Sequence, residues 1–197
     1  MFVFDVETLS TESTCVILSC AMTYMGNLDE NTGNDNLNEI YLDLLENKTL
    51  YVKFLAKEQI DAGRHVSKST MDWWKKQDPQ IRALAFNPTP EDVTVDVGVR
   101  RIKDFMKKWG YDGKNTTIWI RGFLDQMAFE SLCDTFEVEP FTHYSNWRDV
   151  RTAIDLLAET SNKGYCHMRK AFDRNLVQKH DPRHDCCYDA LQLVYHK

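Results

Sequence analysis

The sequence predicts an α/β chain with a mixed β-sheet flanked by α-helices, as a single domain over residues 1–197. Strand-like segments come first, and helical segments then alternate with a short apolar strand. Apolar residues make up 43% of the chain and aromatic residues 12%, which is enough for a sizeable core. We therefore expect three antiparallel strands followed by parallel strands.

The first strands are predicted from alternation and β-propensity. In residues 2–7, Phe and Val side chains alternate with positions that include two acids, as in a strand with one buried face. Residues 15–24 form a second β-like run, and residues 39–44 with 49–54 indicate a further strand pair. The polar residues 26–38, rich in Asn, Asp and Gly, indicate a hairpin loop.

Helical segments dominate the rest of the chain. Ser69, with Asp72 three residues later, resembles a capping box at the start of a helix. Apolar residues from Val95 to Trp109 recur every three or four positions, and Gly110 follows as a helix stop. A short buried strand at 116–120 and an irregular basic stretch at 164–183 are expected between further helices at residues 124–136, 149–160 and 185–195.

Charge and composition exclude several function classes. Thirty acidic residues against 24 Lys and Arg give a formal net charge of −6, which disfavours passive coating of duplex DNA. No apolar run approaches the roughly 20 residues that span a membrane, and Asp5 interrupts any signal peptide. We therefore expect a soluble protein that is not exported.

The cysteines are interpreted as reduced core thiols. None of the six forms a Cys-x-x-Cys pair, and they lie in otherwise apolar segments. A zinc site from Cys166, His167 and either Cys186 or Cys187 is the alternative, and the usual ligand spacing for it is missing.

Asp5 and Glu7 are the first candidate functional residues. Two residues apart on a strand, they share one face at a separation of roughly 6–7 Å. Two ionised carboxylates so placed repel each other unless they share a cation, and oxygen ligands suit Mg²⁺ or Mn²⁺. The alternative is a frayed strand end with both acids in water.

Asp125 is the second candidate, just past the strand that ends at Ile120. An acid at this position also stabilises a helix N-terminus, so capping alone accounts for it. In an open sheet, however, the edge where strands end is the place where ligands bind. Asp134 is the alternative acid, deeper in the same helix.

Two His-x-x-x-x-Asp patterns overlap near the C-terminus, His180 with Asp185 and His184 with Asp189. Five positions on one helix leave two side chains roughly 140° apart, so the histidine is expected in a loop before the helix that carries the acid. Asp189 lies among apolar helical residues, where an unpaired acid is costly. We therefore select His184 with Asp189, and expect His180 at the surface and Asp185 as a helix cap.

Three blocks of sequence accompany these ordered acids: Lys-Ser-Thr-Met-Asp-Trp-Trp-Lys-Lys-Gln at 68–77, Trp-Arg-Asp-Val-Arg-Thr at 147–152, and His-Asp-Cys-x-x-Asp at 184–189. Together they resemble the DEDDh group of 3′–5′ exonucleases, which have an RNase H-like fold. The resemblance spans nearly the whole chain. It is closest to the exodeoxyribonuclease A (DexA) type of T-even phages and more distant to the short exoribonucleases of mycobacteria.

The resemblance implies a two-metal-ion mechanism. Asp5, Glu7, Asp125 and Asp189 would hold two Mg²⁺ or Mn²⁺ ions, and His184 would act as general base on the attacking water. In this group an aromatic residue commonly precedes the mid-chain Asp, a position that Leu124 holds here.

Further residues are candidates for substrate binding. By the resemblance, Thr8 and Leu9 contact the terminal nucleotide, Leu9 as an apolar wedge under its base. Trp73 and Trp74 either stack on an unpaired base or belong to the core. The candidate phosphate contacts, for which solvated surface charge is the alternative, are Arg121, Arg148, Arg151, Arg169, Lys170, Arg174 and Lys179.

The resulting expectation is a 3′–5′ exonuclease that hydrolyses single-stranded DNA to 5′-mononucleotides. An exoribonuclease of the same mechanism is the nearest alternative, because no residue can be named that reads a 2′-hydroxyl. A non-catalytic nucleic-acid-binding domain and a hydrolase of small nucleotides are the others. If the phage resemblance holds, the protein acts in the cytoplasm of a bacterial host.

Overall fold

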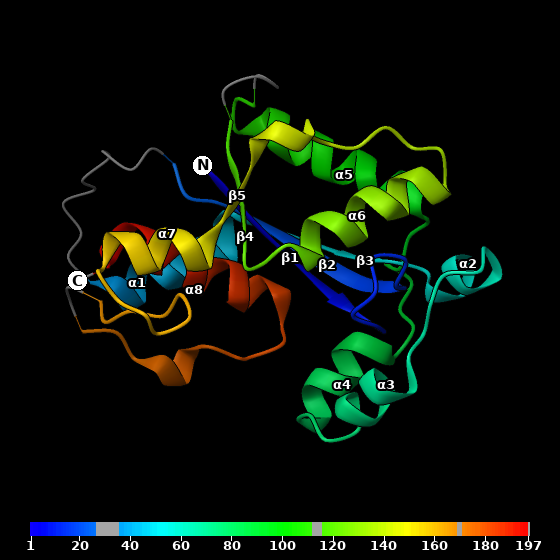
Figure 1. Cartoon of the computed structure of the whole chain (residues 1–197), viewed down its shortest axis with the longest axis horizontal. Helices are drawn as coiled ribbons and strands as arrows, with labels where there is room; N and C mark the ends of the chain where they lie inside the picture. The colour runs from blue at the N-terminus through cyan, green and yellow to red at the C-terminus, as the bar shows by residue number, and fades with distance from the viewer. Residues whose placement is uncertain (27–35, 112–115, 169–170, 197) are drawn as a thin grey trace.

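A five-stranded mixed sheet forms the centre of the computed structural model, which describes residues 1–26, 36–111, 116–168 and 171–196 (Figure 1). Its strand order is β3-β2-β1-β4-β5, with β2 antiparallel to β1 and β3, and β4 and β5 parallel to β1. The strands are β1 (Phe2–Thr8), β2 (Ile17–Tyr24), β3 (Thr49–Lys53), β4 (Ile118–Ile120) and β5 (Trp147–Asp149). The predicted mixed sheet is confirmed.

Helices cover both faces of the sheet. One face packs against α5 (Val95–Lys108) and α6 (Leu124–Thr135). The other packs against α1 (Leu37–Asn47), α7 (Val150–Leu157) and α8 (Pro182–Tyr195). Because β1, β4 and β5 run in the same direction, their carboxyl ends meet at one edge, between α6 on one face and α7 and α8 on the other.

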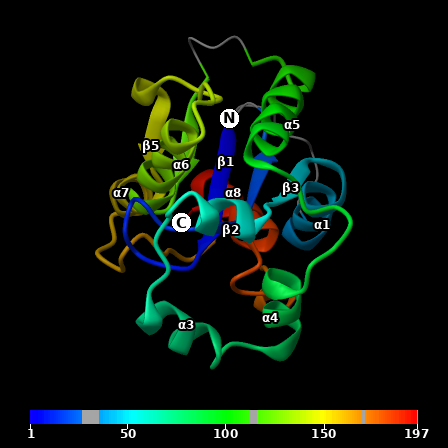
Figure 2. The same ribbon diagram turned by 90° about the vertical axis from the view of Figure 1, so that its right-hand side faces the viewer.

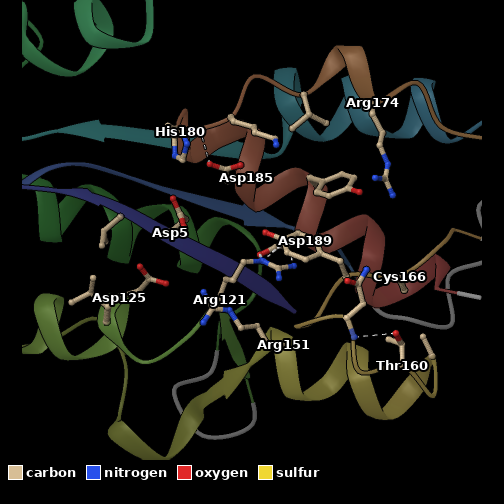
Figure 3. Close-up of a pocket in the computed structure, with 18 of the residues that line it drawn as sticks. Asp5, Arg121, Asp125, Arg151, Thr160, Cys166, Arg174, His180, Asp185 and Asp189 are labelled. Atoms are coloured by element: carbon tan, nitrogen blue, oxygen red, sulfur yellow. Dashed lines mark hydrogen bonds and ion pairs between the residues drawn. The ribbon is translucent and has the colours of Figure 1, made fainter. Parts of the chain in front are cut away.

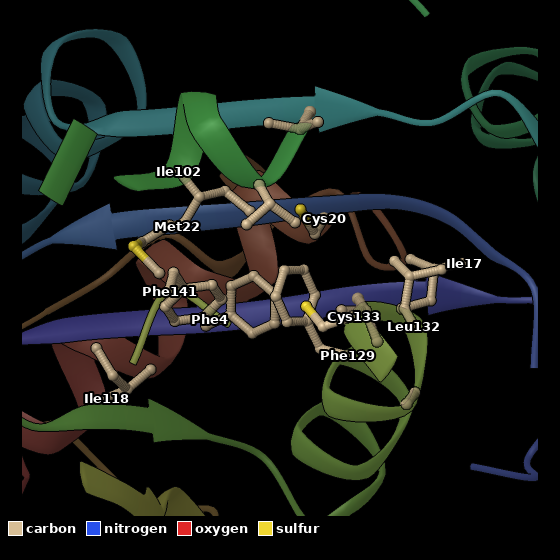
Figure 4. Packing of buried hydrophobic residues seen from close by; sticks show 14 of the residues in the cluster. Phe4, Ile17, Cys20, Met22, Ile102, Ile118, Phe129, Leu132, Cys133 and Phe141 are labelled. Atoms are coloured by element: carbon tan, nitrogen blue, oxygen red, sulfur yellow. The ribbon is translucent and has the colours of Figure 1, made fainter. Parts of the chain in front are cut away.

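The alternation of β1 decides which of its side chains face each layer. Phe2, Phe4 and Val6 belong to the core under α5 and α6, and Val3 belongs to the core under α8. Figure 4 shows Phe4 against the rings of α6 and its following loop, and its centroid lies 5.2 Å from that of Phe129. Asp5, which shares the face of Val3, is therefore directed towards α8.

Three short helices lie beyond the end of the sheet, α2 (Ala56–Asp61), α3 (Lys68–Trp74) and α4 (Pro79–Phe86) (Figure 2). The cap of α3 is Ser67, whose hydroxyl accepts from the Thr70 amide at 3.1 Å, so the predicted start at Ser69 was two residues late. The Trp74 indole N–H donates to the Thr8 carbonyl at 2.9 Å and thereby joins α3 to the end of β1.

The strand predicted at 39–44 is wrong, because this segment lies inside α1. Its buried side chains Leu37, Tyr41 and Leu44 are spaced by four and three residues, the period of a helix with one apolar face. Asn36 caps the helix by accepting from the Asn38 amide at 3.1 Å. Most of the predicted hairpin loop, residues 27–35, lies outside the described residues.

The other helices agree with the sequence apart from their ends. Gly110, at φ +82°, follows α5 as predicted. In contrast, α8 begins at Pro182 rather than at Asp185, and Asp181 is its cap, accepting from the Arg183 amide at 3.1 Å. Proline fits the first helical position because its missing N–H has no partner there. The prediction that Asp185 caps this helix is wrong.

All six cysteines are buried and form no disulfide, as predicted. The Cys186 thiol donates to the Ala21 carbonyl, and the Cys187 sulfur lies 3.3 Å from the Thr49 hydroxyl, so both point into the core. Among the residues that the structure describes, no zinc grouping of these thiols with Cys166 and His167 is formed. Within the same residues, no helix has the length and apolar character required to cross a bilayer.

Candidate active site

A cavity of about 1150 Å³ opens at the edge of the sheet where β1 and β4 end (Figure 3). Its charged lining residues come from β1, from the segment after β4, and from α6, α7 and α8 with the loop before it. They are Asp5, Glu7, Arg121, Asp125, Arg151, His167, Arg174, Lys179, His180, Asp185 and Asp189. The structure thus brings together most of the predicted charged residues, but His184 and Arg148 are not among them.

Asp5 and Glu7, both on β1, line one side of this cavity. Burial raises the pKa of both carboxyls well above the ordinary range, and the negative charges of Asp125 and Asp185 raise them further. The separation of the two acids on β1 is that of a strand, as the sequence indicated. Both groups therefore stand in a site where negative charge is unfavourable without a counter-charge.

Asp125 approaches the same point from the first turn of α6, and its side chain is 6% exposed. Burial raises its pKa to about 8, against the stabilising effect of a backbone hydrogen bond from Val6. Asp134, the alternative acid, is exposed near the other end of α6 and does not line the cavity.

His180 and Asp185 complete the acidic group, contrary to the predicted surface and capping positions. The His180 amide donates to Asp185 Oδ2 at 3.0 Å, and His180 has a left-handed φ of +65°. One ligand atom from each of Glu7, His180 and Asp185 lies within 4.8 Å of the other two. Burial and the neighbouring Asp189 raise the pKa of Asp185 to about 7.

His184 lies in α8, where it faces α1, and not in the predicted loop before this helix. Its Nδ1 is 2.6 Å from the Tyr41 hydroxyl and also accepts from the Gln178 amide at 3.3 Å. A nitrogen that accepts from an amide carries no proton, so the Tyr41 hydroxyl is the donor. Because α8 begins before His184, its side chain and that of Asp185 point in directions roughly 100° apart. The structure therefore separates His184 from the carboxylates.

Asp189 lines the cavity one turn after Asp185, but it is not an open carboxylate. Arg121 Nε and Nη2 donate to its two oxygens at 2.6–3.0 Å. Arg121 Nη1 also donates to the Gly164 carbonyl at 3.0 Å, and its guanidinium lies 4.3 Å from the centre of the Tyr165 ring. Such a bidentate pair stabilises the ionised form of Asp189, although burial still raises the pKa of this carboxyl above its ordinary value.

The two tryptophans have different environments. Trp74 is 1% exposed and belongs to the core between β2, α3 and α4. Trp73 is 39% exposed, and its ring stands edge-on to the His180 ring at a centroid distance of 4.8 Å. Nothing in the sequence indicated this contact, because Trp73 and His180 lie far apart along the chain.

The remaining predicted substrate residues that the structure describes lie outside the cavity lining. Leu9 is 5% exposed and packs with Trp74, while the Thr8 hydroxyl donates to the Ser10 carbonyl at 2.7 Å. Arg148 donates to the carbonyls of Ser145 and Trp147, both at 2.7 Å, and is exposed. Arg169 and Lys170 lie outside the described residues.

The choice of His184 with Asp189 as the catalytic pair stays a prediction, and the structure groups the other pair, His180 and Asp185, with Glu7. A usable signal was present, because Asp-Pro at 181–182 is a typical helix cap followed by a first helical proline. That start places His180 in the loop and Asp185 on the helix, which is the arrangement that the five-residue spacing demands.

Known proteins resemble nearly the whole of this chain. A family model for the 3′–5′ exoribonuclease Rv2179c-like domain matches residues 1–196. The exodeoxyribonuclease of Enterobacteria phage T4 is 27% identical to this chain in an alignment that is 209 residues long with its gaps. The alignment covers 98% of this chain and 87% of that protein. The nuclease domain of 3′hExo, a DEDDh family member solved with bound rAMP, has a TM-score of 0.61 at 12% identity, over 98% of this chain and 88% of that one.

The structural likeness confirms the predicted RNase H-like fold, and the site described above lies at the edge where its parallel strands end. The expected membership of the DEDDh 3′–5′ exonucleases is likewise confirmed. The chain belongs to the Rv2179c-like 3′–5′ exoribonuclease domain family.

Proposed function

We propose that this chain is a divalent-metal-dependent exonuclease that removes 5′-mononucleotides from the 3′ end of single-stranded DNA. The observation that carries the proposal is the convergence of Asp5, Glu7, Asp125 and Asp185 with His180 in the cavity, where the other three acids add to the effect of burial in raising the pKa of Asp5. We call these four carboxylates the acidic side. They differ from the predicted set by Asp185 in place of Asp189, and the histidine by His180 in place of His184.

The donor atoms of the acidic side fit Mg²⁺ or Mn²⁺. All four groups are carboxylates, and in the described part of the chain none of them forms an ion pair with Lys or Arg. Oxygen ligands are preferred by these ions, and two dications balance four negative charges. When bound, the ions would supply an activated water and stabilise the charge that develops on the phosphate and the leaving 3′ oxygen.

His180 is suited to accept the proton of the attacking water. Burial, together with the positive charge of Lys179, lowers the pKa of its imidazole. The ring is therefore uncharged at neutral pH and has a free nitrogen to accept a proton. The edge of Trp73 on one side and the Asp185 contact at the backbone hold the ring beside Glu7.

Asp189 has a supporting part in this scheme. Its two oxygens hold Arg121 in one orientation beside the cavity. Thr8 and Leu9 directly follow Glu7, and we retain them as contacts of the terminal nucleotide. Leu9 needs a shift of the α3 segment to act as a wedge, since little of its surface is exposed.

DNA is favoured as the substrate by the similarity to the phage exodeoxyribonuclease, which extends over 98% of the chain. RNA is the second candidate, because the matching family is described as exoribonuclease domains. Both polymers present the same phosphodiester to the acidic side.

Matched single strands of DNA and RNA, labelled at the 5′ end, test the proposal in Mn²⁺ and in EDTA. We expect a ladder that shortens from the 3′ end only with Mn²⁺, and faster on DNA. Strands labelled at the 3′ end should release a labelled mononucleotide at the earliest time, which separates exonuclease from endonuclease action. A faster RNA ladder would reverse the substrate assignment, and no ladder on either polymer would refute the exonuclease.

A further inference from the structure

The cavity has a second side with the opposite charge. Arg151, from the first turn of α7, and Arg174, in the loop before α8, line it. We call these two residues the cationic side. In Figure 3, Asp5, Asp125 and His180 lie on one side of the cavity and Arg174 on the other, with the Arg121–Asp189 pair between them and Arg151 beside Arg121.

Neither arginine of the cationic side forms an ion pair in the described part of the chain, although the charge of Arg151 offsets part of the pKa rise that burial causes at Asp125 and Asp189. Arg121, their neighbour, is neutralised by Asp189, but no ion pair or side-chain hydrogen bond of Arg151 or Arg174 occurs among the described residues. Both residues are exposed to solvent. Two guanidinium groups with free donors therefore line the same cavity as the four carboxylates of the acidic side.

The backbone around Arg151 is shaped to hold it at the cavity. Gly164, at φ +75°, lies so close that a Cβ there would stand 2.3 Å from the Arg151 Cα. Gly122, at φ +95°, lies against the guanidinium, where a Cβ would be 3.2 Å from Nη1. A side chain at either position would displace Arg151, so the two glycines leave room for it on both the backbone and the guanidinium side.

Guanidinium groups of this kind bind phosphate, with donors that match its oxygens in pairs. An exonuclease that acts from the 3′ end leaves only one nucleotide on the 3′ side of the bond that it cleaves. That nucleotide ends in a hydroxyl and carries no further phosphate. Any phosphate beyond the reacting one therefore belongs to nucleotides on the 5′ side.

We propose that Arg151 and Arg174 bind the phosphodiesters of the nucleotides immediately 5′ of the scissile bond. This inference rests on the proposed function. It defines the preferred substrate as an oligonucleotide with at least two phosphodiesters, bound through its backbone irrespective of base sequence. Arg121, which contacts Asp189 and the Tyr165 ring, lines the cavity between the acidic side and Arg174.

The test compares two substrates that differ in length. A thymidine hexanucleotide reaches the cationic side, whereas the p-nitrophenyl ester of thymidine 5′-monophosphate has one phosphodiester and no nucleotide on its 5′ side. For Arg151→Gln and for Arg174→Gln we expect the ratio of kcat/KM, hexanucleotide over ester, to fall about fivefold to tenfold, mainly through KM. The slope of log affinity against log salt should decrease by about one for each arginine removed.

Arg101→Gln is the matched control, because it removes an exposed arginine from α5 on the opposite face of the sheet. Its ratio and salt slope should equal those of the wild type. An unchanged ratio in the Arg151 and Arg174 variants would overturn the inference. An equal loss on both substrates would also overturn it, since the arginines would then act at the reacting phosphate.

Binding measured without divalent ions keeps the two proposals separate. Fluorescence anisotropy of the labelled hexanucleotide in EDTA should show about fivefold to tenfold weaker binding by each variant. If the wild type hydrolysed neither substrate with Mn²⁺, the proposed function would fail, while the anisotropy would still decide the assignment of the cationic side.

Discussion

The acidic and cationic sides of the cavity both carry ionisable groups that form no ion pair in the described part of the chain, but the protein holds them differently. The four acids of the acidic side lie on β1 and in the first turns of α6 and α8, where burial raises the pKa of each carboxyl. Arg151 and Arg174 are exposed, the first in the first turn of α7 and the second at the start of a short 3₁₀ helix, η2 (Arg174–Leu176). Buried charges on regular elements are fixed in place, and exposed ones adapt to a flexible ligand. We therefore expect changes on the acidic side to reduce kcat and changes on the cationic side to raise KM.

The largest effect should follow loss of an acid from the acidic side. Asp125→Asn removes a carboxylate that would hold a metal ion, and the loss of several kcal/mol of transition-state stabilisation corresponds to a fall in kcat on the order of 10³-fold or more. Asp134→Asn is the matched control on the same helix and should retain wild-type kcat. Steady-state kinetics on the hexanucleotide measure both, and a large effect of Asp134→Asn would return the metal to the alternative acid.

The second largest effect on kcat is expected from His180→Ala, and it should differ sharply from that of His184→Ala. His180→Ala removes the proposed general base and should lower kcat by roughly 10²–10⁴-fold. His184→Ala breaks the contact with Tyr41, so it should cost about 1 kcal/mol in the free energy of unfolding while most of kcat remains. Denaturant unfolding and single-turnover kinetics separate the two effects. The opposite pattern would restore His184 as the base.

A smaller effect is expected for Asp189→Asn. The amide no longer balances the charge of Arg121, so the arginine loses its fixed orientation beside the cavity. A supporting residue of this kind should change activity by about 10–100-fold, well below the effect of a metal ligand. If Asp189→Asn were as inactive as Asp125→Asn, Asp189 would be a ligand and not an anchor of Arg121.

The smallest effect concerns stability in the absence of metal. The pKa of Asp185 is raised to about 7 and that of Asp125 to about 8, against about 4 in an unfolded chain. The folded state thus binds more protons than the unfolded state between these values, so the free energy of unfolding falls as the pH rises through them. In EDTA, Tm should decrease by a few degrees from about pH 5 to about pH 8.

Mn²⁺ should remove most of that decrease, because the ions balance the ionised carboxylates. The double variant Asp125→Asn, Asp185→Asn is the control, and its Tm in EDTA should depend less on pH. A wild-type Tm that rises with pH in EDTA would show that these carboxylates are stabilised by other charges.

Local patterns were sufficient to predict much of the fold and part of the site. Alternation placed Asp5 and Glu7 on one face of β1, and helical periodicity located α5 and α6. The segment at 39–44 was misread because its β-branched and aromatic residues outweighed a helical period that shows only over the wider window from Leu37 to Leu44.

The rest of the site depends on contacts between distant parts of the chain. Nothing near Asp189 in the sequence reveals that Arg121 neutralises it, and the apolar helix around it made an open carboxylate plausible. The contact of Trp73 with His180 is of the same kind. Tertiary pairing of this sort decides which of several acids stays unpartnered, and local spacing does not record it.

Calorimetric titration of Mn²⁺ into the wild type, Asp185→Asn and Asp189→Asn tests the central assignment most directly, because it reads metal binding without catalysis. We expect the affinity for Mn²⁺ to fall at least about tenfold in Asp185→Asn and to stay within about threefold of the wild type in Asp189→Asn. Loss of Mn²⁺ binding in Asp189→Asn, with binding retained in Asp185→Asn, would contradict the acidic side as defined here.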